Sequence, residues 1–164
     1  DDGGTREAKV ISRIGDLPAE AWDRLANPDP AQFNPFVAHA FLAALETAGT
    51  TGLETGWLPQ HIVLENAAGV IEAAMPLYVK THSRGEYVFD HAFADAYHRA
   101  GGRYYPKLQV AVPFTPVPGP RVLIAPEADR VNAETTLVAA AMTLADQIGA
   151  SSVHITFPQE AEWK

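Results

Sequence analysis

The chain has 164 residues, of which 47% are hydrophobic and 20% are charged, a composition typical of one globular domain with a sizeable buried core. It contains no cysteine, which excludes disulfide bonds, thiolate nucleophiles and zinc sites with cysteine ligands. The net charge of −8 argues against direct binding to DNA through neutralised phosphates.

The first residues lack the apolar stretch behind basic residues that marks a secretory signal. Every apolar run is also too short to span a membrane. We therefore expect a cytoplasmic protein without a membrane span.

The predicted elements of the first half begin after a disordered tail over residues 1–8, so that the folded domain covers 9–164. A short strand near Val10 is followed by a helix that buries Trp22 and Leu25, and Asn34-Pro35 starts a second helix. A hairpin follows, with arms over 61–65 and 70–80. Pro76 in the second arm indicates an edge strand or a bulge.

The second half continues this alternation of helices and strands. The pattern first predicts a helix over 91–100, a strand over 108–112 and an extended proline-rich connection. A helix over 132–148 follows, with a buried stripe of Leu137, Ala141, Leu144 and Ile148 and a left-handed cap at Gly149. The last predicted elements are a buried strand over 153–157 and a helical turn from 158. Such an order predicts an α/β or α+β domain.

Positive charge is concentrated in the middle of the chain. Residues 80–121 hold six basic and three acidic side chains, a net charge of +3 within a chain whose remainder carries −11. This pattern fits either scattered surface charges or an anion-binding cleft, which we would place around Lys107 and Arg121.

The segment over 104–116 mixes aromatic, cationic, amide and hydroxyl side chains around a strand. Lys107 and Gln109 lie two residues apart, so one strand face would hold both as neighbours able to bind a polar ligand. The alternative is that they form the solvent face of an edge strand. The candidate substrate-binding residues are Tyr104, Lys107, Gln109, Thr115 and Arg121.

The candidates for proton transfer are Asp95, His91 and Tyr105. His91 and Asp95 share one helix face with His98, and a carboxylate beside an imidazole makes an acid/base pair. Successive turns of one straight helix rarely converge on a metal, so we expect no metal site. We expect His39, His61 and His154 to be packed histidines, and Ser151-Ser152-Val153-His154 lacks the Gly-x-Ser-x-Gly pattern of serine hydrolases.

Several separate runs, in order along residues 14–160, give the chain a family resemblance. The runs are Asn34-Pro35-Phe36, His39-Ala40-Phe41-Leu42, Gly56 to His61, Ala74 to Tyr78, Gly85 to Asp90, and Tyr104 to Gly119. In these runs the chain resembles the Fem-like (FemAB-like) proteins of bacterial peptidoglycan biosynthesis or recognition, which are related to GNAT acyltransferases.

The resemblance implies a GNAT-like mixed sheet flanked by helices, incomplete at its C-terminus, in an N-terminal half whose C-terminal partner half is missing. It also implies transfer of an acyl or aminoacyl group to the amine of an acceptor such as a peptidoglycan precursor, with acyl-CoA or aminoacyl-tRNA as donor. Two alternatives remain open: a non-catalytic module that recognises a cell-wall precursor, and a purely structural half-domain.

One interval departs from relatives that use acetyl-CoA. Such relatives carry a glycine-rich loop whose backbone N–H groups bind pyrophosphate before the long helix. Here the corresponding interval, residues 113–132, contains five prolines at 113, 116, 118, 120 and 126. Because proline has no N–H group, we expect that these 164 residues bind no cofactor by themselves.

Overall fold

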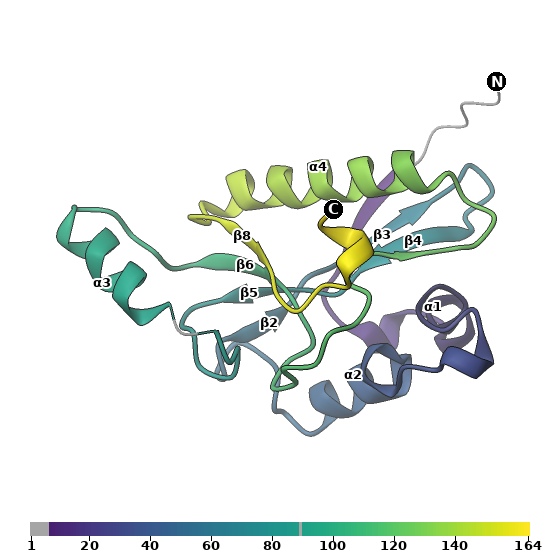
Figure 1. Ribbon diagram of the computed structural model, residues 1–164, viewed down its shortest axis with the longest axis horizontal. Coiled ribbons are helices and arrows are strands. Elements are labelled where there is room, and N and C mark those ends of the chain that lie inside the picture. Colours follow the sequence, from purple (N-terminus) through teal and green to yellow (C-terminus); the bar gives the residue numbers. More distant parts are fainter. Residues whose placement is uncertain (1–6, 89) are drawn as a thin grey trace.

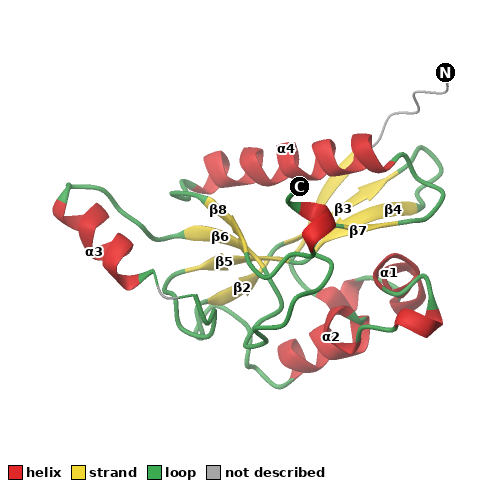
Figure 2. Cartoon of the chain, viewed as in Figure 1, coloured by secondary structure: helices red, strands yellow, loops and turns green. Residues whose placement is uncertain are grey.

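The computed structural model describes residues 7–88 and 90–164, and within them the chain forms four α-helices and two four-stranded sheets (Figures 1 and 2). The mixed α/β class is therefore confirmed, whereas the expectation of one sheet is wrong. The first sheet contains, in spatial order, β1 (Glu7–Ile11), β3 (His61–Glu65), β4 (Ile71–Met75) and β7 (Leu123–Ile124). The second contains β2 (Trp57–Pro59), β5 (Leu77–Lys80), β6 (Lys107–Val110) and β8 (Val153–Ile155).

The folded part begins earlier than the sequence predicts. Strand β1 starts at Glu7 and runs antiparallel to β3, with Glu7 opposite Glu65 and Ile11 opposite His61. Residues 1–6 of the expected tail lie outside the described residues. The boundary at residue 8 is wrong for Glu7 and Ala8, because their partners lie more than fifty residues away and leave no local signal.

Pro76 separates the two sheets. The predicted hairpin is confirmed for β3 and β4, but its expected second arm consists of two strands, β4 and β5, which belong to different sheets. Proline has no N–H group for a sheet ladder, so the pairing changes at this residue. Beside it, the N–H of Gln60 donates to the carbonyl of Leu77 at 2.8 Å and joins the sheets.

Helices cover both faces of the first sheet and one face of the second (Figure 1). Helix α4 (Arg130–Ile148) packs on both sheets, while α1 (Ala19–Ala26) and α2 (His39–Thr47) cover the opposite face of the first. The predicted stripe of α4 is confirmed except at Ile148, which is 39% exposed. Gly149 adopts the predicted left-handed cap with φ of 66°.

The other face of the second sheet is polar. The strand register places Trp57 beside Lys80, Lys80 beside Lys107, Tyr78 beside Gln109, and Gln109 beside His154. Residues 81–88 and Asp90 fold over this polar face, where Arg84, Glu86 and Asp90 contact the two lysines. Strand β8 lies at the edge of the sheet and its residues are only partly buried, so the expectation of a buried strand there is wrong.

Helix α3 (His91–Arg99) projects from one end of the molecule (Figure 2). None of its residues is buried, and Phe93 and Tyr97 are 72% and 49% exposed. No helix in the described part of the chain is long and apolar enough to cross a membrane.

Candidate functional site

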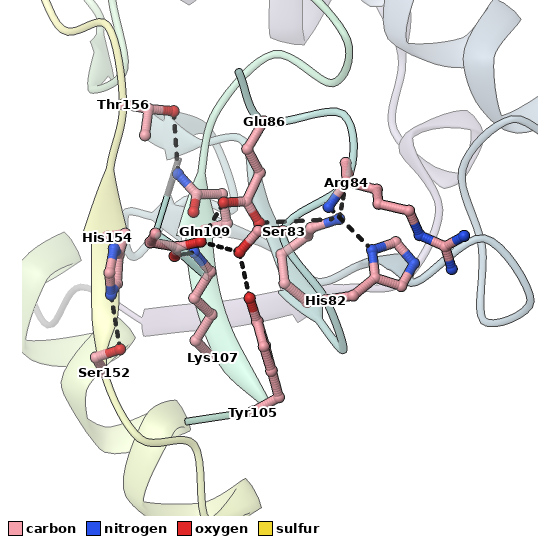
Figure 3. Close-up of polar contacts among 12 residues, drawn as sticks. His82, Ser83, Arg84, Glu86, Tyr105, Lys107, Gln109, Ser152, His154 and Thr156 are labelled. Carbon is pink, nitrogen blue, oxygen red and sulfur yellow. Dashed lines mark hydrogen bonds and ion pairs between the residues drawn. The ribbon is translucent and has the colours of Figure 1, made fainter. Parts of the chain in front are cut away.

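A buried ionic cluster lies on the polar face and consists of Lys80, Glu86, Asp90 and Lys107. Figure 3 labels two of its members, Glu86 and Lys107. The Lys107 ammonium donates to Glu86 Oε2 at 2.8 Å and to Asp90 Oδ2 at 2.7 Å. The Lys80 Nζ atom lies 4.0 Å from Glu86 Oε1 and 3.6 Å from the centre of the Trp57 ring. Two cations and two carboxylates therefore offset each other where water has little access.

Asp90 is held as a carboxylate. Its oxygens accept hydrogen bonds from Lys107, from the hydroxyl of Ser83 and, at 2.7 Å, from the hydroxyl of Tyr104. Burial by itself raises the pKa of Asp90, but these three hydrogen bonds outweigh burial and lower the pKa to about 2. Burial and the bond to Asp90 raise the pKa of Tyr104, so Tyr104 remains a donor at neutral pH.

Lys80 is the least compensated charge of the cluster. Its ammonium donates to the carbonyl of Arg84 at 3.2 Å, and its nearest carboxylate oxygen is 4.0 Å away. Burial lowers the pKa of Lys80 to about 7, although the charge of Glu86 opposes this change. Burial also raises the pKa of Glu86 against the influence of Lys107.

The lowered pKa of Lys80 predicts that stability increases with pH. Between the folded pKa of about 7 and the ordinary value of 10.5, the unfolded chain binds more protons at Lys80 than the folded chain does. We expect the free energy of unfolding of the wild type to rise, relative to that of Lys80→Met, by about 1 to 2 kcal/mol from about pH 7 to pH 9. Urea unfolding at both pH values measures this difference.

The control is Lys164→Met, whose side chain is 63% exposed and which should keep the pH dependence of the wild type. Parallel pH profiles for wild type and Lys80→Met would contradict the prediction.

A groove of about 370 Å³ lies beside the ionic cluster. The aromatic rings of Phe93, Tyr97 and Tyr104 contribute to its walls, and α3 supplies the first two of them. The polar groups that line it are Asp90, Tyr104, Ser151, Ser152 and His154. An apolar slot with a few convergent polar groups is the usual form of a small-molecule site.

Ser152 and His154 form a hydrogen-bonded pair in this groove. Ser152 Oγ and His154 Nε2 are 2.8 Å apart, and Figure 3 shows both side chains beside β8. The imidazole stands edge-on to the Tyr104 ring at 6.2 Å between centroids. Burial lowers the pKa of His154, and the positive charge of Lys107 lowers it further, whereas the negative charge of Asp90 raises it. The net effect is a lowered pKa, so the ring is neutral near pH 7.

Lys107 and Gln109 lie on one face of β6, but β6 is flanked by β5 and β8, so the edge-strand alternative is wrong. Both side chains are buried, and Gln109 Nε2 donates to Thr156 Oγ1 at 3.0 Å. The charge of Lys107 is already paired with two carboxylates, which contradicts the expected exposed lysine of an anion-binding cleft. That Lys107 and Gln109 contact a ligand remains a prediction.

Arg121 does not join Lys107 in a cleft. Its buried guanidinium donates to the carbonyls of Thr156, Val117 and Pro120, at 2.8, 2.9 and 3.2 Å. Arg121 therefore ties the proline-rich segment to the end of β8, and burial lowers its pKa to about 10. Thr115 donates its hydroxyl to the carbonyl of Pro113 at 3.0 Å, and neither Thr115 nor Arg121 lines the groove.

The candidates for proton transfer lie in different places. His91 and Asp95 are exposed on α3 and do not line the groove. The hydroxyl of Tyr105 shares a hydrogen bond with that of Ser83, one step from Asp90. Their catalytic roles remain predictions. Within residues 7–88 and 90–164, the structure contains no group of three or more acidic or histidine side chains that could hold a metal ion.

Sequence reasoning overlooked Asp90, Ser152 and His154 as site residues. His154 lies on the predicted strand over 153–157 and Ser152 directly precedes that strand, so the spacing of two residues in extended chain places both side chains on one face. Asp90 had no comparable signal, since its partner Lys107 lies on a strand that follows α3.

Comparison with known proteins supplies a family. No curated protein and no solved structure matched the chain. The model of the FemAB-like family, described as peptidoglycan biosynthesis/recognition, matches residues 13–164, which include every residue of the ionic cluster and the groove. The chain therefore belongs to the FemAB-like family of peptidoglycan biosynthesis and recognition.

Proposed function

We propose that the chain is part of a transferase that moves an acyl or aminoacyl group to the amine of a peptidoglycan precursor. The observation that carries the proposal is the groove, in which a neutral imidazole and an ionised carboxylate lie beside aromatic walls. Membership of a family associated with peptidoglycan supports the choice of acceptor. The GNAT-like arrangement of the domain is part of the same proposal.

The polar groups of the groove suit an amine acceptor. The aromatic rings of Phe93, Tyr97 and Tyr104 are able to contact an incoming ammonium group, and the Asp90 carboxylate adds a negative charge that Lys107 partly offsets. The amine must lose protons as it attacks a carbonyl carbon, and the unprotonated ring of His154 is able to accept one. The protein would otherwise act mainly by holding amine and carbonyl in line.

The donor is an activated acyl ester or thioester, such as aminoacyl-tRNA or acyl-CoA. The segment before α4 contains Pro116, Pro118 and Pro120, and prolines present no N–H groups to a pyrophosphate. We therefore propose that the contacts to the donor's phosphates lie outside the 164 residues of this chain. The 164 residues by themselves would then bind no cofactor.

The test is transfer of a labelled acyl or aminoacyl group to a precursor peptide that contains a free amine, followed by mass spectrometry. We expect His154→Gln to lower the rate by roughly 10²-fold, the usual contribution of a general base. His98→Gln is the matched control, because His98 is exposed on α3 and does not line the groove.

Equal rates for both variants would exclude His154 as the base. Binding of the precursor without transfer from either donor class would favour the alternative function, a module that recognises the precursor.

A further inference from the structure

Two neighbouring serines at the groove differ in what holds their hydroxyl groups. Ser151 donates its hydroxyl to the backbone carbonyl of Tyr104. The hydroxyl of Ser152 lies 2.8 Å from the Nε2 atom of His154 and, at the longer distance of 3.3 Å, also contacts the Ser151 hydroxyl. With the imidazole proton on Nδ1, the Nε2 atom accepts this hydrogen bond and is placed to remove the hydroxyl proton.

The sheet fixes the geometry of the Ser152–His154 pair. His154 lies opposite Gln109 in the parallel pairing of β8 with β6, and the carbonyl of Ser152 accepts the N–H of Leu108 at 2.9 Å. Both side chains therefore point to the same face from a backbone anchored on each side of Val153. A serine hydrolase obtains a comparable placement from a tight turn after a strand, whereas here the two-residue repeat of the extended chain at the start of β8 provides it.

The pair is also accessible. Ser152 and His154 are partly buried and line the groove, in contrast to Lys107 and Gln109, which are fully covered. A carbonyl group bound in the groove would meet the hydroxyl of Ser152 without any rearrangement of the ionic cluster. The proximity of nucleophile and base is the arrangement that activates a serine for acyl transfer.

We propose that Ser152 and His154 are a nucleophile and its base, and that Ser152 carries the acyl group as an ester before the group passes to the amine. This inference rests on the proposed transferase function and adds a covalent step to it. It makes the activated acyl ester or thioester a direct ligand of the groove.

The proposed reaction has two halves, acylation of Ser152 and transfer from Ser152 to the amine. The Ser152 oxygen forms a bond to the carbonyl carbon of the donor, its proton moves to His154 Nε2, and the bond from that carbon to the donor's oxygen or sulfur breaks. His154 returns the proton to the leaving group. In the second half the amine forms a bond to the ester carbon and the bond from that carbon to the Ser152 oxygen breaks. The amine's proton passes through His154 to the Ser152 oxygen, and no oxidant or reductant is needed.

The experiment uses 4-nitrophenyl acetate as the probe, with intact-mass measurement and peptide mapping of the acetylated protein. We expect one acetyl group on Ser152 of the wild type, removed by neutral hydroxylamine as an ester is, and none at residue 152 in Ser152→Ala. His154→Gln should slow acetylation roughly 10²-fold. Ser12→Ala, an exposed serine far along the chain from β8, should be acetylated like the wild type.

Acetyl groups found only on lysines or on Ser151 in the wild type would overturn the proposal, and this result needs no variant to fold. An unchanged acetylation rate in His154→Gln would also overturn it. The covalent step and the transferase function fail separately: amine transfer by Ser152→Ala at the wild-type rate removes the covalent step alone. A labelled Ser152 whose acetyl group never reaches an amine removes the transferase function, and with it the second half of the step, but leaves Ser152 as the nucleophile and His154 as its base.

Discussion

Replacement of Lys107 by methionine is expected to lower the free energy of unfolding by about 3 to 5 kcal/mol, the usual cost of removing one partner of a buried ion pair. Lys107 is 1% exposed and holds the carboxylates of Glu86 and Asp90 at 2.8 and 2.7 Å. Methionine fills much of the same volume, so most of the loss comes from two buried carboxylates that no longer have their cation. A view of Lys107 as an exposed ligand contact would instead predict almost no change in stability.

Urea unfolding at neutral pH measures the effect of Lys107→Met. In a thermal melt, a loss of this size corresponds to a fall in Tm of roughly 10 °C for a domain of this length. The matched control is Lys9→Met, because Lys9 also pairs with a carboxylate, that of Glu65, but its side chain is 40% exposed. Exposed ion pairs contribute about 0 to 1 kcal/mol, so equal losses in the two variants would disprove the burial argument.

Trp22→Ala is expected to cost about 3 to 5 kcal/mol for a different reason, the loss of a large side chain from the core. Trp22 is 0% exposed, and its ring packs edge-on against His61 with 5.7 Å between centroids. Its indole N–H donates to the carbonyl of Val37 at 2.9 Å, so the substitution leaves a cavity and also an unpaired acceptor. The loss should appear as a lower denaturation midpoint in urea.

Trp163→Ala provides a control with the same chemical change at a position that is 66% exposed. We expect its free energy of unfolding to stay within about 0.5 kcal/mol of the wild type. A loss comparable to that of Trp22→Ala would contradict the argument from burial, because the two substitutions would then cost the same at a buried and at an exposed position.

Local sequence signals predicted the elements that depend on local chemistry. The apolar spacing of α4 and Gly149 after it act within a few residues, and the structure has these features as predicted except at Ile148. The hairpin of β3 and β4 was likewise readable, because its turn and both arms are contiguous. The spacing of apolar residues along the sequence carries no information on which of the two sheets a strand joins.

The errors concern contacts between distant segments. Pro76 was recognised as unusual, but the change of sheet depends on how β2 and β6 pair with β5. The basic middle of the chain looked like a surface patch because Glu86 and Asp90 meet Lys107 only after the intervening helix α3 has folded back. Tyr104 was predicted as a site residue, and it does line the groove.

The parallel pairing of β6 with β8 also has a consequence for the order of folding. The hairpin of β3 and β4 closes a short loop, whereas β8 reaches β6 only after the whole of α4 has been made and packed. Closing long loops is slow, and chains emerge from the ribosome N-terminus first. A nascent chain that has not yet released residue 155 is therefore expected to hold its first sheet while Ser152 and His154 still lack their places beside β6.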